Sequence, residues 1–324
     1  MKVAVLGAGG IAGVVSRTLA QMKNVECYAV ASRSLEKAEK FAKDYGFAKA
    51  YGSYEEMLKD EAVELVYIAT PHSHHYACIK QCILAHKPVI CEKAFTMNAA
   101  QAKEIRDLAA KEKVYVTEAI WPRYMPSRAM IDETLKSGII GEVKDMTANL
   151  SYVIHQVERI KEPALAGGAL LDIGVYGINF MLMHFGKDID RVESSVQMTP
   201  TGVDGQETIT VHYKDGRMAV LTHSIYCRSD RKGIFHGDKG YMVVENINNP
   251  QSIAVYDLDD KLLLEKKVPQ QISGYEYEFA ESARCLAEGK LQSDSMPLEE
   301  SVYMMDLMDQ IRKQWGLKYP GEEA

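Results

Sequence analysis

The chain has 324 residues, of which 47% are hydrophobic and 26% charged; this globular composition excludes a disordered or fibrous protein, and the length predicts two domains. The net charge of −7 argues against a nucleic-acid partner, because phosphate binding needs a basic surface. The six cysteines form no CxxC pair and predict no disulfide framework, which is typical of a reducing compartment.

The first third of the chain alternates between strands and helices. Apolar runs at residues 2–6, 26–31, 65–69, 89–91 and 114–117 predict strands, and helical spacing or capping residues predict helices at 11–22, 34–45, 53–59 and 98–111. Because each strand is almost continuously apolar, we expect a parallel sheet that is covered on both faces. Residues 1–120 are therefore predicted to form an α/β Rossmann domain.

The pattern changes after residue 120. A helix at 127–137 precedes a long alternating strand from residue 142, and a Gly-rich turn at 167–168 leads into another helix. Further strands are predicted at 192–198, 208–213, 218–224, 241–245, 253–256 and 262–265, with closing helices at 275–288 and 298–315. Residues 121–324 are therefore predicted to form an α+β domain with a large, mostly antiparallel, open-faced sheet.

No membrane segment or signal peptide is predicted. The first strand begins at Lys2, which leaves no room for a leader. The longest apolar stretch, residues 169–185, contains Asp172, Asn179 and His184, so it predicts a buried helix and not a membrane span. We expect a cytoplasmic protein that binds neither membrane nor nucleic acid.

A dinucleotide-binding fingerprint follows the first strand. The G-x-G-x-x-G/A pattern falls on Gly7, Gly9 and Ala12, between a strand and the helix that it opens. The helix N-terminus offers backbone N–H groups to a pyrophosphate. The predicted contacts of this turn are Gly7, Gly9, Gly10, Ile11 and Ala12; the alternative is a purely structural Gly-rich turn.

The end of the second strand predicts the choice of cofactor. An acidic residue there would bind the ribose 2′-OH of NAD, but the chain has Ser32 and Arg33. Arg33 can pair with a 2′-phosphate, Ser32 can donate to it, and Lys37 adds charge. NADP is therefore preferred over NAD, and a solvated helix start is the alternative for Arg33 and Lys37.

Polar residues also follow later strands, at the sheet edge where such folds bind ligands. The candidate cofactor contacts there are Thr70, Pro71, His72, Glu92, Lys93, Trp121 and Arg123, although Arg123 fits an interdomain anchor equally well. His72, His74 and His75 resemble a metal cluster, but without a carboxylate partner a polar loop is the better interpretation, so no metal site is predicted.

Two residues on the later helix complete the candidate site. Asp172 and Tyr176 are four residues apart, so both would face the same side of a helix. The structural alternatives are a helix cap for Asp172 and a core tyrosine for Tyr176, while Lys93 has the alternative of a surface lysine.

Together these motifs resemble the Gfo/Idh/MocA oxidoreductase family over essentially the whole chain. The matching segments are the N-terminal Gly motif and residues 68–71, 91–93, 118–123, 168–176 and 315–320. The sequence is most similar to the branch that contains dimeric dihydrodiol dehydrogenase, NADP-dependent D-xylose dehydrogenase and glucose–fructose oxidoreductase. The resemblance implies bound NADP, hydride transfer at nicotinamide C4, catalytic roles for Lys93, Asp172 and Tyr176, and a homodimer formed through the C-terminal sheet.

Oxidising a hydroxyl carbon requires a base for the hydroxyl proton, and the reverse reaction requires an acid. A tyrosine with a pKa of about 10 is a poor base at neutral pH, but the ammonium of Lys93 would favour the phenolate of Tyr176 and lower that pKa. Lys93 could also donate to the substrate oxygen, and Asp172 could orient Lys93 or bind a substrate hydroxyl.

One residue departs from the family pattern, because Ala94 stands where the family usually has proline. If proline serves to hold a cis peptide, alanine makes that conformation cost roughly 3–4 kcal/mol. The Lys93–Ala94 bond is then either trans or held by tertiary contacts.

The leading hypothesis is an NADP(H)-dependent enzyme that interconverts a secondary alcohol or sugar hemiacetal with its carbonyl, on an aldose, polyol or dihydrodiol. A non-turnover NADP-binding redox or metabolite sensor is the alternative, which Ala94 favours and the three intact catalytic residues oppose. An enzyme that retains its cofactor and swaps hydrides between two sugars is a further alternative.

Overall fold

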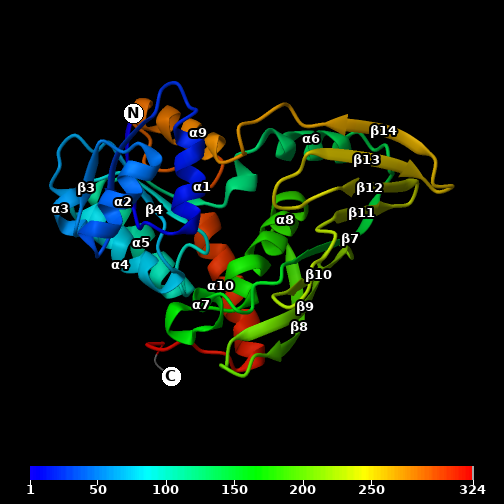
Figure 1. The fold of residues 1–324 in the computed structure, drawn as a ribbon. Coiled ribbons are helices and arrows are strands. Elements are labelled where there is room, and N and C mark those ends of the chain that lie inside the picture. The colour runs from blue at the N-terminus through cyan, green and yellow to red at the C-terminus, as the bar shows by residue number, and fades with distance from the viewer. Residues whose placement is uncertain (323–324) are drawn as a thin grey trace. The chain divides into compact units, whose positions relative to one another are not determined.

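The computed structural model describes residues 1–322, which fold as two compact units (Figure 1). The first unit comprises Met1–Trp121 and Gln271–Met305. The second comprises Pro122–Gln270 and the chain from Asp306 onward. The chain therefore leaves the first unit near the predicted boundary and returns to the first unit at Gln271.

The first unit is built on a six-stranded parallel sheet. Its strands are β1 (Lys2–Leu6), β2 (Glu26–Ala31), β3 (Lys49–Tyr51), β4 (Leu65–Ile68), β5 (Val89–Glu92) and β6 (Val116–Ala119), and their order is β3-β2-β1-β4-β5-β6. The helices between them are α1 (Gly10–Leu19), α2 (Leu35–Tyr45), α3 (Tyr54–Leu58), α4 (His72–Leu84) and α5 (Ala99–Glu112). This is the Rossmann order, and the predicted fold class is confirmed.

Local sequence explains where several of these helices begin. Ser34, Ser53 and Asn98 each accept, through the side chain, a hydrogen bond from the backbone N–H three residues later. These caps satisfy donors that the first turn of a helix leaves without a partner. The short edge strand β3, by contrast, was not predicted, because three residues carry no readable period.

The returning segment 271–305 completes the core of the first unit. It contains α9 (Glu276–Ala287) and the beginning of α10 (Leu298–Trp315). Phe279 is fully buried in the core that surrounds β1 and β4, and the Tyr115 hydroxyl lies 2.9 Å from the Ser282 hydroxyl. The predicted division at residue 120 places this segment in the second domain, whereas in the structure it belongs to the first unit.

The second unit contains an eight-stranded sheet. Its strands are β7 (Val143–Ser151), β8 (Ile189–Met198), β9 (Asp204–Tyr213), β10 (Met218–Ser224), β11 (Gly233–Gly237), β12 (Gly240–Val244), β13 (Ser252–Asp257) and β14 (Leu262–Lys267), in the order β14-β13-β12-β11-β7-β10-β9-β8. Every neighbouring pair is antiparallel except β7 with β10, which is parallel. The predicted, mostly antiparallel sheet is confirmed, although β11 was missed.

One face of this sheet is covered by a buried helix. The short helix η1 (Trp121–Arg123) begins at the last residue of the first segment of the first unit. The second unit then contains α6 (Pro126–Lys136), α7 (Glu158–Lys161), η2 (Pro163–Leu165), the π-helical turn η3 (Leu170–Gly174), α8 (Val175–Phe185) and the part of α10 from Asp306 onward. Helix α8 packs against β7 and β10 (Figure 1). Residues 163–185 are long and apolar enough to cross a membrane, but 94% of their apolar 18-residue stretch is buried, as in the core helix of a soluble protein.

Candidate cofactor and active site

The turn after β1 is held against two neighbouring strand ends. Gly7 has φ of 108°, which favours glycine, and its N–H donates to the Ala31 carbonyl at 2.9 Å. A Cβ at Gly7 would lie 2.7 Å from the Ala69 carbonyl oxygen and 3.5 Å from Thr70 Cγ2. The ends of β1, β2 and β4 therefore meet at this glycine.

The next two residues leave open space at the start of α1. A Cβ added at Gly9 or Gly10 would have no atom within 4 Å, and Gly9 provides no side-chain cap for the helix. Ala12 is fully buried, so α1 packs closely on the sheet. Backbone N–H groups beside open space form a cradle that fits a pyrophosphate.

Arg33 lies exposed between the end of β2 and the start of α2. Ser32 is buried, its N–H donates to the Tyr51 carbonyl at 3.1 Å, and Lys37 is exposed in the first turn of α2. Burial, followed by the positive charge of Arg33, lowers the pKa of His74. The charge of Arg33 is therefore felt at the first turn of α4, which follows β4.

His75 links that loop to the segment after β5. Its Nδ1 lies 2.8 Å from the Ala94 carbonyl oxygen and its Nε2 lies 2.9 Å from the Thr70 carbonyl oxygen. Pro71 precedes α4, and His72 is its first residue and is buried. His75 therefore holds the loop in place through both ring nitrogens, a structural role that its sequence context did not predict.

The segment after β5 places Lys93 beside a buried carboxylate. Glu92 accepts a short hydrogen bond from the Tyr67 hydroxyl and another from the Lys93 N–H at 3.2 Å. The Lys93–Ala94 peptide bond is cis, and Ala94 is fully buried while Lys93 is partly exposed. The Glu92 carboxylate therefore points into the protein, where it holds the backbone N–H of Lys93.

The two candidates after β6 belong to different units. Trp121 stacks on Tyr275 of the returning segment, with ring centroids 4.2 Å apart and 9° between the planes. Arg123 is 4% exposed, and its Nε donates to Asn179 Oδ1 on α8 at 2.7 Å. Arg123 thus anchors a helix of its own unit.

In the second unit, Asp172 lies inside η3 and Tyr176 is the second residue of α8; both are buried. Arg159 of α7 donates to Asp172 Oδ1 at 2.5 Å, and the Arg159 side chain is half exposed. Arg159 is not among the predicted site residues, because α7 is a single short turn with no recognisable motif. Asp172 lies within the π-helical turn and not at the position that precedes a helix.

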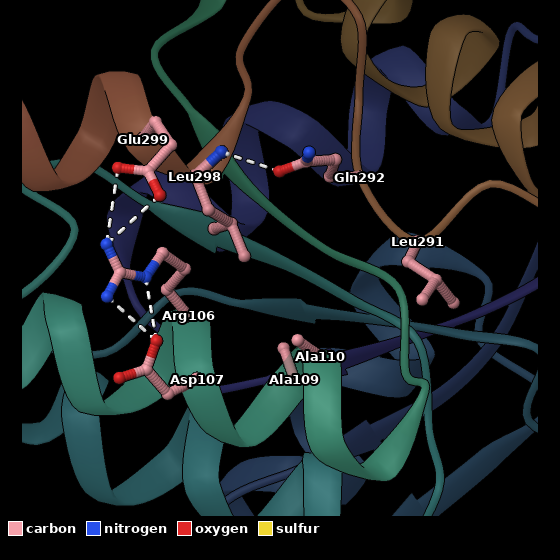
Figure 2. Close-up of a pocket in the computed structure, with 8 residues that line it drawn as sticks. All are labelled: Arg106, Asp107, Ala109, Ala110, Leu291, Gln292, Leu298 and Glu299. Atoms are coloured by element: carbon pink, nitrogen blue, oxygen red, sulfur yellow. Dashed lines mark hydrogen bonds and ion pairs between the residues drawn. The ribbon is translucent and has the colours of Figure 1, made fainter.

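A cavity of about 350 Å³ in the first unit contains none of the predicted site residues (Figure 2). It is lined by Arg106, Asp107, Ala109, Ala110, Leu291, Gln292, Leu298 and Glu299. Its charged groups are already paired, because Arg106 donates to Glu299 at 3.0 Å and to Asp107 at 2.8 Å. It therefore offers a ligand few available polar groups.

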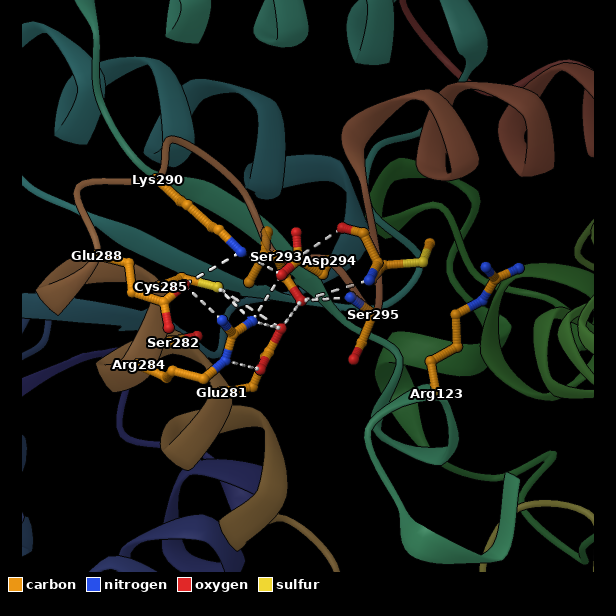
Figure 3. Close-up of polar contacts among 12 residues, drawn as sticks. Arg123, Glu281, Ser282, Arg284, Cys285, Glu288, Lys290, Ser293, Asp294 and Ser295 are labelled. Atoms are coloured by element: carbon orange, nitrogen blue, oxygen red, sulfur yellow. Dashed lines mark hydrogen bonds and ion pairs between the residues drawn. The ribbon is translucent and has the colours of Figure 1, made fainter. Parts of the chain in front are cut away.

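Three potential metal ligands, Glu281, Cys285 and Asp294, lie within 4.8 Å of one another near α9 (Figure 3). Arg284 donates to Glu281 at 2.9 Å and to Asp294 at 2.7 Å, and Lys290 also pairs with Asp294. The two cations already neutralise these carboxylates, so an ion-pair network explains the cluster.

Comparisons with known proteins match the chain along most of its length. Residues 1–120 match the profile described as oxidoreductase family, NAD-binding Rossmann fold (GFO/IDH/MocA), and residues 129–243 match the GFO/IDH/MocA C-terminal domain. The chain is 31% identical to the trans-1,2-dihydrobenzene-1,2-diol dehydrogenase of Mus musculus, with 98% of each chain covered. It is 33% identical to that of Homo sapiens, covering 91% of this chain and 90% of the relative.

Solved structures share the fold at lower identity. A 3-ketoreductase from Actinomadura kijaniata in complex with NADP and TDP-benzene superposes with a TM-score of 0.89 at 22% identity, covering 97% of each chain. An aldose–aldose oxidoreductase from Caulobacter crescentus gives a TM-score of 0.88 at 17% identity, covering 98% of each chain.

Proposed function

Because this chain belongs to the Gfo/Idh/MocA family of oxidoreductases, we propose that it uses NADP(H) to interconvert a secondary alcohol or sugar hemiacetal with its carbonyl. The substrate class is an aldose, polyol or dihydrodiol. The observation that carries this proposal is the likeness to dihydrodiol dehydrogenases, at 31% identity over 98% of both chains. The open cradle at the start of α1 supports a bound dinucleotide.

The residues of the first unit fit NADP. Gly9 and Gly10 would admit the pyrophosphate, and the exposed guanidinium of Arg33 would pair with the 2′-phosphate. The related 3-ketoreductase has been solved with NADP, which is consistent with this choice. When bound, the nicotinamide supplies the hydride chemistry.

The proton chemistry is assigned to three side chains. We propose that Tyr176 takes the proton from the substrate hydroxyl in oxidation and returns it in reduction. The Lys93 ammonium favours the phenolate of Tyr176 and donates to the substrate oxygen as negative charge develops. Asp172, held by Arg159, binds a substrate hydroxyl or orients Lys93.

The test is the absorbance of the reduced nicotinamide, followed with NADP and NAD across aldoses, polyols and diols, and in reverse with aldehydes, ketones and dicarbonyls. We expect turnover with NADP well above NAD. Tyr176→Phe should remove turnover and leave NADPH affinity within twofold, whereas Tyr277→Phe on α9 should leave both unchanged. Tight NADPH binding without turnover on any substrate would favour a sensor.

The same proposal includes a cytoplasmic homodimer formed through the open face of the second sheet. On that face, Ile234 is opposite Val243 and Tyr241 is opposite Tyr256, and all four are partly exposed. Aliphatic and aromatic side chains in adjacent strands are typical of a surface that a second copy covers. Light scattering of wild type against Val243→Glu, which places charge on this face, tests the assembly.

A further inference from the structure

A buried polar cluster lies beneath the segment that carries Asp172 and Tyr176. Glu207 of β9 and His223 of β10 are directly opposite each other in the strand register, and His223 Nδ1 lies 2.8 Å from Glu207 Oε1. Asp204, at the start of β9, accepts from the Leu170 N–H at 2.5 Å. All three side chains are at most 2% exposed, so this is an interior cluster and not a surface network.

Three glycines of the overlying segment each face one member of this cluster. A Cβ at Gly168 would meet the Asp204 carboxylate, one at Gly174 the Glu207 carboxylate, and one at Gly177 the His223 ring, each closer than 3.0 Å. No ordinary side chain fits at these positions without displacing the cluster or the helix. The glycines therefore set the distance between the sheet and the segment that carries the proposed catalytic residues.

Tyr319, near the C-terminus, holds the N-terminal end of the same segment. The Tyr319 hydroxyl is buried and donates to the Gly167 carbonyl at 3.0 Å. Residues 167–177 are thus fixed by Tyr319 at one end, by Asp204 at Leu170, and by the cluster beneath Gly174 and Gly177. Each of these contacts lies within the second unit.

We propose that Asp204, Glu207 and His223 are positioning residues, which hold the segment 168–177 so that Asp172 and Tyr176 are presented for catalysis. This inference rests on the proposed function, because it assumes that these two residues act on substrate. The cluster itself contacts no substrate. Burial raises the pKa of Asp204 and of Glu207 to about 8 and lowers the pKa of His223 to about 3, so the cluster stays close to neutral.

The first test compares Asp204→Ala with Asp204→Asn. Alanine removes the acceptor of the Leu170 N–H, whereas asparagine keeps an oxygen there and resembles the protonated acid. Asp204→Ala should lower kcat at least tenfold and speed amide hydrogen exchange in residues 168–177 at least tenfold. NADPH affinity should stay within twofold, and Asp204→Asn should retain most of the wild-type kcat and protection. Thr222→Ala, exposed beside His223 on β10, is the control.

The second test does not depend on Asp204→Ala folding. Gly177→Ala should lower kcat at least tenfold, and the double variant Gly177→Ala/His223→Ala should recover part of it, because the smaller side chain leaves room for the methyl group. Folded Asp204→Ala and Gly177→Ala with wild-type kcat and exchange would overturn the positioning role while leaving the proposed function intact. If wild type has no turnover, the proposed function fails. In that case, amide exchange at 168–177 that is unchanged in Asp204→Ala would overturn, separately, the claim that the cluster holds this segment.

Discussion

The pH dependence of stability provides a quantitative test of the cluster. Burial, and then the electrostatic interaction with the neighbouring carboxyl of Glu207, raise the pKa of Asp204 from its ordinary value of 3.8 to about 8. The fold therefore prefers the protonated acid. Its contribution to stability is complete below the unfolded pKa and is lost as pH rises to about 8, because only the unfolded state is ionised in that window.

The magnitude follows from proton linkage. Between pH 6.5 and 7.5 the unfolded chain has released the proton of Asp204 and the folded chain has kept it, so this group removes about 1.4 kcal/mol of stability per pH unit. Below pH 6.5 His223 acts in the opposite direction, since its pKa is lowered to about 3 by burial. The chosen window lies above that opposing effect.

The measurement is urea unfolding at several pH values in a Trp121→Phe background. The chain has two tryptophans, so the remaining Trp315, on α10, reports on the second unit. The free energy of unfolding should fall with pH more steeply than in the Asp204→Asn variant, by about 1.4 kcal/mol per unit. Parallel curves for the two proteins between pH 6.5 and 7.5 would refute the assignment.

Four further outcomes are expected. Gly7→Ala forces alanine into positive φ against a carbonyl, at a cost of about 1–3 kcal/mol, and calorimetry should find NADPH binding at least tenfold weaker; unchanged affinity would argue against the cradle. Arg33→Asp should lower the NADP-to-NAD ratio of kcat/KM at least tenfold, and an unaltered ratio would contradict the 2′-phosphate contact. His75→Ala removes the ring contacts with the Thr70 and Ala94 carbonyls and should lower kcat more than twofold, because Lys93 precedes Ala94; a kcat within twofold of wild type would show that this link does not position Lys93. Arg159→Ala should raise KM more than Arg159→Lys does, since lysine keeps a positive charge near Asp172; equal values would mean that the charge is not used.

The Rossmann half was predictable because its signals are local. Continuous apolar strands, the Ser34 and Ser53 caps, and the glycine turn at Gly7 each act within a few residues, and the structure has them at the expected places. Two strands were missed because their local signal is weak. The edge strand β3 is too short to show alternation of apolar and polar residues, and β11 begins and ends with glycine.

The candidate site was less predictable, since its supporting contacts join distant parts of the chain. The α-helical spacing assumed for Asp172 and Tyr176 is altered by the π-helical turn at Leu170–Gly174, in which hydrogen bonds span five residues. Arg159 comes from another helix. Asp204 and Glu207 lie on the part of β9 that precedes the predicted strand at 208–213, and His223 lies in a strand for which no site residue was predicted. No composition or spacing marks such partners.

The return of residues 271–305 to the first unit affects how the chain is synthesised and how it can be divided. A ribosome releases β1–β6 long before Phe279, so the Rossmann core remains short of a buried aromatic side chain while some 150 intervening residues are made. An N-terminal fragment ending at residue 121 would expose the apolar surface that this segment covers. Expressing the cofactor unit alone therefore requires a spliced polypeptide that joins residue 121 to residue 271 through a linker.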